Sequence, residues 1–265
     1  MAIDPENTLI WAALVVYGGT AGLVAIRSET GPWVGRGLVL ASLLLCAVIA
    51  LRWGRLGHGP FINLYEILLS NLFSLGILYA LARARQSRLR VADRVVLPVL
   101  LLLGAWLVSV PALDSHLPPT YETPWLWVHL LSGKLFLAAA LIAAGLGGVL
   151  ILRRLRLFPA EDVPEADVER LAWRWLGIGL VFHSTMLVAG AVWAQDAWGR
   201  YWAWDPLETS AFLTWLALAL ALHSRLAWRV APAVAGLLFW GVFSLAFLTF
   251  FGVPFLSQAP HQGAI

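Results

Sequence analysis

The sequence predicts an all-α protein embedded in a membrane, built as a bundle of about eight transmembrane helices. Of its 265 residues, 60% are hydrophobic and 12% are charged, and the mean hydropathy is +0.80. Soluble domains usually carry about 25% charged residues, so lipid must solvate most of this apolar surface. The apolar residues also gather into runs near the length of about 20 residues that a spanning helix needs.

Eight apolar stretches are long enough to cross a bilayer. They are residues 8–26, 38–53, 64–82, 95–111, 125–152, 172–193, 207–225 and 233–256. The first stretch follows Asp4 and Glu6 and lacks the basic segment of a signal peptide, so we do not expect it to be removed. The longest connector, about 153–171, is too short for a separate domain. We therefore expect residues 1–265 to form a single integral-membrane domain.

The arginines predict the orientation of these helices, because cytoplasmic loops of membrane proteins are enriched in Lys and Arg. If the expected spans alternate in direction, fourteen arginines fall on one side and three fall on the other, namely Arg52, Arg55 and Arg200. This asymmetry predicts that both termini lie outside the cytoplasm. The other outward segments would be residues 52–63, 111–124, 194–206 and 257–265.

Two classes of function are excluded by composition. The sequence pI is about 9.4, but the basic residues form short clusters between apolar runs, which is a membrane-topology pattern and does not indicate nucleic-acid binding. Cys46 is the only cysteine. The chain therefore forms no internal disulfide, no CxxC redox pair and no thiolate metal cluster.

One outward segment, about 193–208, is rich in tryptophan and reads WAQDAWGRYWAWDPLE. Four indoles fall within residues 193–204. They fit an aromatic belt at the membrane interface, and they also fit a platform for a flat aromatic ligand. Arg200 and the free N–H groups of nearby helix starts would suit a ligand that carries carboxylates.

The acids beside this segment also fit a structural role. The start of the seventh span shows the pattern of a capping box. Asp205 would be the N-cap, Pro206 the first helical residue and Glu208 the third. Asn63 and Glu66 give the same signal for the third span. A capping role and a ligand-binding role are compatible, because both use the positive end of the helix dipole.

Histidines occur within or beside four of the expected spans, where ionisable groups are costly and often functional. His129 lies about 8 Å inside the fifth span, and His223 lies about 24 Å along the seventh span from Leu207. His183 falls at mid-membrane in the sixth span, and His261 follows the last span. Each of them could instead be a hydrogen-bonded packing residue.

Two outward histidines, His129 and His261, would flank the indole platform. Haem suits such a site because it is planar, aromatic and carboxylated, and its iron accepts axial imidazoles. The remaining histidines, His58 and His116, fall in outward loops. We expect both to be ordinary surface residues.

The tryptophan segment resembles a known signature. Trp198-Gly199-Arg200-Tyr201-Trp202-Ala203-Trp204-Asp205-Pro206-Leu207-Glu208 looks like the WGxxWxWDxxE signature of the WWD haem-handling family of cytochrome c assembly proteins. The chain most resembles the CcsA/ResC branch, because Asn63-Leu64-Tyr65-Glu66 is similar to its NLYE element. Residues 125–129 and 214–225 resemble its WLxxHV and ITW…LHTR elements. The resemblance covers about 60–261, although Leu207 replaces a usual Lys and residues 259–263 lack the GLHSYG form of the tail.

The resemblance implies a site for haem b, bound non-covalently as a substrate. By position, His129 and His261 would be the outer axial ligands of the iron. His223 would be an inner ligand for haem that arrives from the cytoplasm, with the partner subunit or His183 supplying the second ligand. The other implied site residues are Trp198, Gly199, Arg200, Trp202, Trp204, Asp205, Glu208, Asn63, Tyr65 and Glu66. No catalytic residue is assigned.

The function that the resemblance implies is that of the membrane subunit of a System II holocytochrome c synthase. We expect it in a bacterial cytoplasmic membrane, with a thylakoid membrane as the less favoured alternative. This subunit would bring haem to the outer surface and present it to an apocytochrome c bearing CxxCH, whose two thiols add to the haem vinyl groups. A CcsB/ResB-type membrane partner is expected, because this chain has no large extracytoplasmic domain to hold the apocytochrome.

Three other functions remain open. The chain could be a CcmC-like subunit that delivers haem to a chaperone, or a haem exporter without a role in bond formation. It could also be a b-type electron-transfer cytochrome, which needs two histidines facing each other inside the bilayer. His183 and His223 are the only pair that the sequence offers for this.

Overall fold

The computed structural model describes residues 4–26, 31–157, 163–228 and 230–253. Within these ranges the chain is helical and has no strand, and eight helices are long and apolar enough to cross a membrane. The prediction of an all-α, multi-span membrane protein is therefore confirmed. The chain divides into two compact units, whose described parts are residues 4–116 and 117–253.

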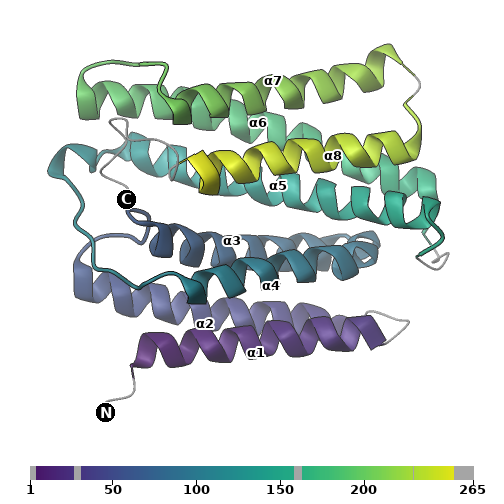
Figure 1. Ribbon diagram of the computed structural model, residues 1–265, viewed down its shortest axis with the longest axis horizontal. Coiled ribbons are helices and arrows are strands. Elements are labelled where there is room, and N and C mark those ends of the chain that lie inside the picture. Colours follow the sequence, from purple (N-terminus) through teal and green to yellow (C-terminus); the bar gives the residue numbers. More distant parts are fainter. Residues whose placement is uncertain (1–3, 27–30, 158–162, 229, 254–265) are drawn as a thin grey trace. The chain divides into compact units, whose positions relative to one another are not determined.

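The described residues of the first unit form four long helices, which Figure 1 labels α1 to α4. They are α1 (Pro5–Ile26), α2 (Pro32–Leu56), α3 (Leu64–Arg85) and α4 (Asp93–Ser109). A short 3-10 helix, η1 (Ser87–Ala92), leads into α4, and the two form one candidate span. Helix α1 packs against α2 and α4, and α3 packs against the same two helices.

A buried ion pair closes one end of the first unit. Arg83, in the last turn of α3, donates from Nε and Nη2 to both carboxylate oxygens of Asp93 at 2.8–3.0 Å. Its Nη2 also donates to the carbonyl of Gly31, and the Tyr79 hydroxyl donates to Asp93 at 2.7 Å. Arg83 and Asp93 are both buried. Each charge is tolerated in this apolar setting because the other compensates it.

The second unit contains α5 (Pro124–Arg154), α6 (Glu165–Trp198), α7 (Pro206–Ala227) and α8 (Pro232–Phe247). The 3-10 turn η2 (Pro119–Tyr121) precedes α5, and the π-helical turn η3 (Leu248–Gly252) extends α8. Helix α5 is the most buried candidate span, because α6 and α8 both pack along it. Its buried stretch from Phe136 to Leu150 consists mainly of Ala, Gly and Leu, and small residues allow neighbouring helices to approach closely.

Helix α6 is longer than hydropathy predicts. The expected span was 172–193, whereas the helix runs from Glu165 to Trp198. Hydropathy marks only the apolar part of a helix, and Glu165 and Asp167 favour its first turn through the helix dipole. As a result residues 193–198 of the tryptophan segment are helical, and only the stretch 199–205 is loop.

The Arg83–Asp93 pair gives the first testable prediction. Asp93→Ala is expected to lower the free energy of unfolding by about 3–5 kcal/mol, because it leaves a buried guanidinium without its counter-charge. Thermal unfolding in detergent, followed by circular dichroism, measures the effect. Asp167→Ala is the matched control: its partner Arg170 is exposed, and the pair spans 3.2 Å, so the expected loss is below about 1 kcal/mol. Equal losses in the two variants would contradict the assignment.

Candidate functional site

An aromatic cluster lies at the end of the second unit where α5 begins and α6 ends. It consists of Tyr121, His129, Trp193 and Trp198, which we call the first aromatic cluster. Trp193 and Trp198 meet edge to face, with ring centroids 4.9 Å apart. Tyr121 contacts both indoles edge-on, at 5.2 and 5.7 Å. The indole N–H of Trp193 donates to the Tyr121 carbonyl at 3.1 Å, so η2 and the end of α6 are held together.

The imidazole of His129 completes this cluster. Its ring stacks on Trp193, with centroids 6.0 Å apart and planes 19° from parallel. Its Nδ1 lies 2.9 Å from the backbone carbonyl of Met186 on α6. Because a carbonyl oxygen only accepts hydrogen bonds, Nδ1 carries the hydrogen, and in the neutral ring Nε2 keeps its lone pair. This is a form of histidine that can bind a metal.

A second aromatic cluster follows on the loop and on α7, formed by Trp202, Trp204, Phe212 and Trp215. Trp202 and Trp204 meet edge to face at 5.7 Å, and Phe212 stacks on Trp215 at 6.2 Å. Trp204 is 67% exposed. The Nε1 atom of Trp202 is buried and has no hydrogen-bond partner among the described residues. The cluster thus offers an indole face and an indole donor.

Asp205 and Glu208 hold the backbone that carries these indoles. Asp205 Oδ1 accepts from the Glu208 backbone N–H at 2.8 Å, which confirms the predicted N-cap of α7. Glu208 Oε2 accepts from the Ala203 N–H at 2.6 Å, two residues before the position that a standard capping box uses. Trp204 has φ +59°, a left-handed conformation that costs a non-glycine residue roughly 1–2 kcal/mol. The two acids therefore fix a strained backbone between them.

The other predicted residues of this loop have different surroundings. Gly199 ends α6 in the left-handed conformation, with φ +74°, and its N–H donates to the Gln195 carbonyl. A residue with a side chain would be strained there. Arg200 is exposed in the loop that follows. It is placed where its guanidinium can meet a carboxylate from solution.

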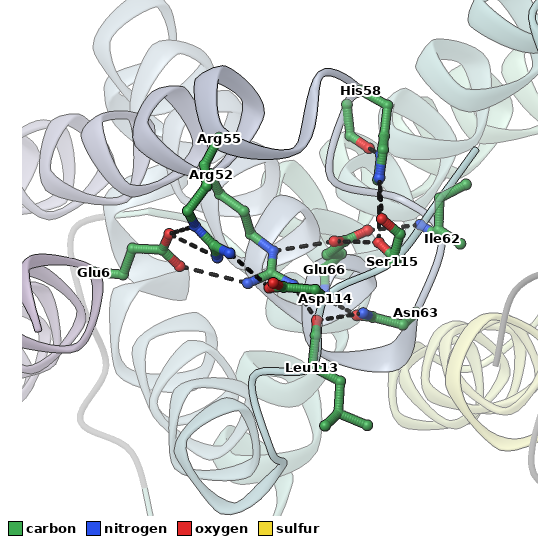
Figure 2. Close-up of polar contacts among 11 residues, drawn as sticks. Glu6, Arg52, Arg55, His58, Ile62, Asn63, Glu66, Leu113, Asp114 and Ser115 are labelled. Atoms are coloured by element: carbon green, nitrogen blue, oxygen red, sulfur yellow. Dashed lines mark hydrogen bonds and ion pairs between the residues drawn. The ribbon is translucent and has the colours of Figure 1, made fainter.

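The predicted residues Asn63 and Glu66 belong to a polar cluster in the first unit, shown in Figure 2, and Tyr65 lies beside it. Glu66 is fully buried. Its Oε1 accepts from Arg52 Nε at 3.0 Å and from the Ser115 hydroxyl at 2.6 Å. Asn63 caps α3 by accepting from the Glu66 N–H at 2.9 Å, as predicted. The guanidinium of Arg52 lies 5.0 Å above the Tyr65 ring.

This cluster also fixes the start of α1 and the segment 113–115. Arg52 pairs with Glu6 at 3.4 Å and donates to the Leu113 carbonyl. Arg55 joins Glu6 to Asp114, at 3.1 and 2.7 Å. The hydrogen bond from Arg55 lowers the pKa of the exposed Asp114 carboxyl. Of the predicted site residues, Asn63, Tyr65 and Glu66 thus belong to the first unit, and the other described ones belong to the second.

His58 is not the surface residue that the sequence suggested. It is 8% exposed, with Nδ1 2.9 Å from the Gly59 carbonyl and Nε2 2.8 Å from the Ser115 carbonyl. It is buried because the Arg52–Glu66 contacts draw residues 113–115 over the end of α2. His116 is exposed, as expected.

His183 and His223 lie too far apart to share one iron. His183 is fully buried and its Nε2 donates to the Ala211 carbonyl of α7 at 2.9 Å. Helix α7 is continuous from Pro206 to Ala227, so the 12 residues from Ala211 to His223 cover about 18 Å. The b-type cytochrome built on this pair is therefore excluded. The suggestion that His183 shares an inner haem with His223 is wrong for the same reason.

Some expectations concern residues that the structure does not describe, and some contacts were not expected at all. His261 lies outside the described residues. Sequence reasoning missed Tyr121 and the Met186 carbonyl. Tyr121 lies in a connector without a recognisable motif. A backbone carbonyl is present in every residue, so the sequence does not indicate which one forms a given contact. Only the fold shows that Tyr121 packs on Trp193 and Trp198 and that the Met186 carbonyl accepts from His129.

Residues 61–261 match the sequence profile of a family described as "Cytochrome C assembly protein". The cytochrome c biogenesis protein CcsA of Chlamydomonas reinhardtii is 30% identical over 267 residues, covering 93% of this chain and 72% of the relative. CcsA of Prochlorococcus marinus (strain MIT 9312) is 31% identical over 256 residues, covering 84% and 82%. CcsA of Chlorella vulgaris is 28% identical over 295 residues, covering 97% and 91%.

The N-cap of α7 gives the second testable prediction. Asp205→Asn keeps an oxygen that can accept from the Glu208 N–H, whereas Asp205→Ala removes it, at a typical cost of about 0.5–2 kcal/mol. The Asn variant should therefore unfold close to wild type in detergent, and the Ala variant at lower temperature. Equal loss in the two variants would show that the negative charge itself is needed.

Proposed function

Since the chain belongs to the family of cytochrome c assembly proteins, we propose that it binds haem b non-covalently and presents it to apocytochrome c for covalent attachment. Its role in cytochrome c biogenesis and haem handling follows from the family. The haem type, the binding residues and the partner are our proposal. The observation that carries it is the first aromatic cluster, in which His129 keeps the Nε2 lone pair and stacks on Trp193.

The proposed outer site joins indole faces, one imidazole and donors for carboxylates. Haem is a flat aromatic ring, which packs well against Trp and Tyr side chains. His129 would be one axial ligand of the iron and His261 the second. Helix α5 begins without a side-chain cap, and the buried Thr123 Oγ1 has no partner among the described residues. The positive end of the α5 dipole, together with Arg200, suits the haem carboxylates.

The chemistry of attachment needs positioning more than it needs a nucleophile from this chain. Each thiol of a CxxCH segment adds across one haem vinyl group, so the sulfur bonds to carbon and the thiol hydrogen goes to the other vinyl carbon. Both cysteines belong to the apocytochrome. The acids of the segment already serve the backbone, because Asp205 caps α7 and Glu208 holds Ala203. The chain would therefore supply orientation, with a CcsB/ResB-type membrane subunit holding the apocytochrome.

We place this site on the extracytoplasmic face of a bacterial cytoplasmic membrane, because the arginine asymmetry of the loops favours that orientation. The multi-pass character itself follows from eight helices of spanning length. A second, inner haem position would then lie near His223, which is exposed towards the other end of α7. Haem would enter there and leave at the first aromatic cluster.

The direct test combines the wild-type protein with His129→Ala, which is the third prediction. Wild-type protein purified from haem-replete cells should show a Soret band and a b-type reduced spectrum. His129→Ala should hold haem more weakly, and added imidazole should partly restore the spectrum by filling the vacant axial position. Covalent haem on an apocytochrome, co-expressed with the membrane partner, provides the functional measurement. A wild-type preparation without a Soret band would overturn the proposal.

The fourth prediction separates the inner position from the outer one. Residues 207 and 223 are 16 residues apart in the continuous α7, which corresponds to about 24 Å, so no side chain bridges the two levels. His223→Ala should reduce the total haem per protein and leave the spectrum of the remaining outer haem unchanged. If its spectrum instead matches that of His129→Ala, a separate inner position does not exist. His116→Ala, at an exposed histidine, is the control.

A further inference from the structure

Gly190 stands in the interior of α6, four residues after Met186 and three before Trp193. Glycine in the middle of a helix costs roughly 0.5–1 kcal/mol relative to alanine. Local helix propensity therefore argues against glycine at this position. The reason for it must lie in what packs against the helix there.

The neighbour is the ring of His129. A Cβ atom at position 190 would lie 2.6 Å from His129 Nδ1 and 2.9 Å from its Cε1. Both separations are shorter than non-bonded atoms tolerate. The imidazole can occupy its place only because residue 190 has no side chain.

The same missing side chain exposes the hydrogen-bond acceptor of His129. In a helix the Cβ of one residue lies beside the carbonyl four residues earlier. On α6 this is visible where Ser184 donates to the Leu180 carbonyl and Thr185 to the Val181 carbonyl. For residue 190 the corresponding carbonyl is that of Met186, which accepts from His129 Nδ1 at 2.9 Å. A methyl group at position 190 would lie between the His129 ring and the Met186 carbonyl.

We propose that Gly190 is a positioning residue for haem: it lets the Met186 carbonyl select the Nδ1–H tautomer of His129, in which Nε2 carries the lone pair that can bind iron. The proposal rests on the proposed function for the identity of the ligand, but its geometric part concerns this chain alone. The neutral imidazole of a free histidine prefers the opposite tautomer, with the hydrogen on Nε2. The Met186 carbonyl reverses that preference, and Gly190 makes the carbonyl reachable.

Gly190→Ala tests the geometric part in haem-free protein. The methyl group would turn the ring away, so the hydrogen bond to Met186 and the stack on Trp193 are both lost. The ¹⁵N resonances of the His129 ring report the tautomer directly. We expect Nδ1–H in wild type and a shift to Nε2–H in the variant. Gly177→Ala is the matched control, because Gly177 lies on the same helix with no atom within 4 Å of the added Cβ.

The haem-loaded protein tests the functional part. Partners that orient a metal-binding histidine typically affect metal affinity by about 10–100-fold, so Gly190→Ala should retain haem that much more weakly. Added imidazole should restore its spectrum, as for His129→Ala, while Gly177→Ala stays like wild type. Imidazole rescue distinguishes a lost ligand from a general loss of structure.

A double variant keeps the test decisive if Gly190→Ala folds poorly. In His129→Ala/Gly190→Ala the ring that clashes is absent, so the double variant should be as stable as His129→Ala. Additional destabilisation would show that another group opposes the methyl, and would overturn the proposal. An unchanged tautomer in Gly190→Ala would also overturn it. Absence of haem in the wild type would refute only the proposed function, because the tautomer measurement needs no haem.

Discussion

In a bilayer, every buried charge and backbone donor must find its partner inside the protein, and the first unit is organised around that requirement. Helix α3 carries one buried charge near each end: Glu66 pairs with Arg52, and Arg83 pairs with Asp93. Glu66 and Arg83 are 17 residues apart, which corresponds to about 26 Å of helix. The apolar core of a bilayer is about 30 Å thick. The two ion pairs therefore fit the two edges of that core, where charge is least costly, and they tie α3 to both helices that flank it.

The second unit is stabilised mainly by apolar packing. Its central helix α5 is apolar and densely packed over residues 136–150, so stability there needs few polar contacts. Buried polar atoms without a hydrogen-bond partner among the described residues occur in both units, and Thr123 Oγ1 and Trp202 Nε1 are two of those in the second unit. They lie at the start of α5 and in the second aromatic cluster. In our proposal these two atoms of the second unit donate hydrogen bonds to a ligand. In the first unit, Glu66 and Asp93 instead form buried ion pairs that stabilise the fold.

Local features were predictable from the sequence and long-range contacts were not. The spans follow from hydropathy, and the N-caps Asn63 and Asp205 follow from residue spacing, because each depends on neighbours within one turn of helix. The burial of His58 depends on the carbonyl of Ser115, which is 57 residues away. The tautomer of His129 depends on the carbonyl of Met186, also 57 residues away. Such contacts join backbone atoms to side chains that are remote in the sequence, so residue spacing does not predict them. The position of His129 near the indoles was inferred from a motif, but its orientation needed the fold.

The tryptophan segment shows how structural and binding roles divide within one motif. Its acids accept from backbone N–H groups on either side of Trp204, which has φ +59°, and these hydrogen bonds offset the cost of that strained conformation. Gly199 ends α6, and Trp202 and Trp204 meet edge to face in the loop that follows. In our proposal, selectivity for an iron-containing ring depends on the imidazole of His129, whose tautomer is set by the Met186 carbonyl. Capping and ligand presentation are thus linked: the caps set the backbone, and the backbone decides which aromatic atoms a ligand can reach.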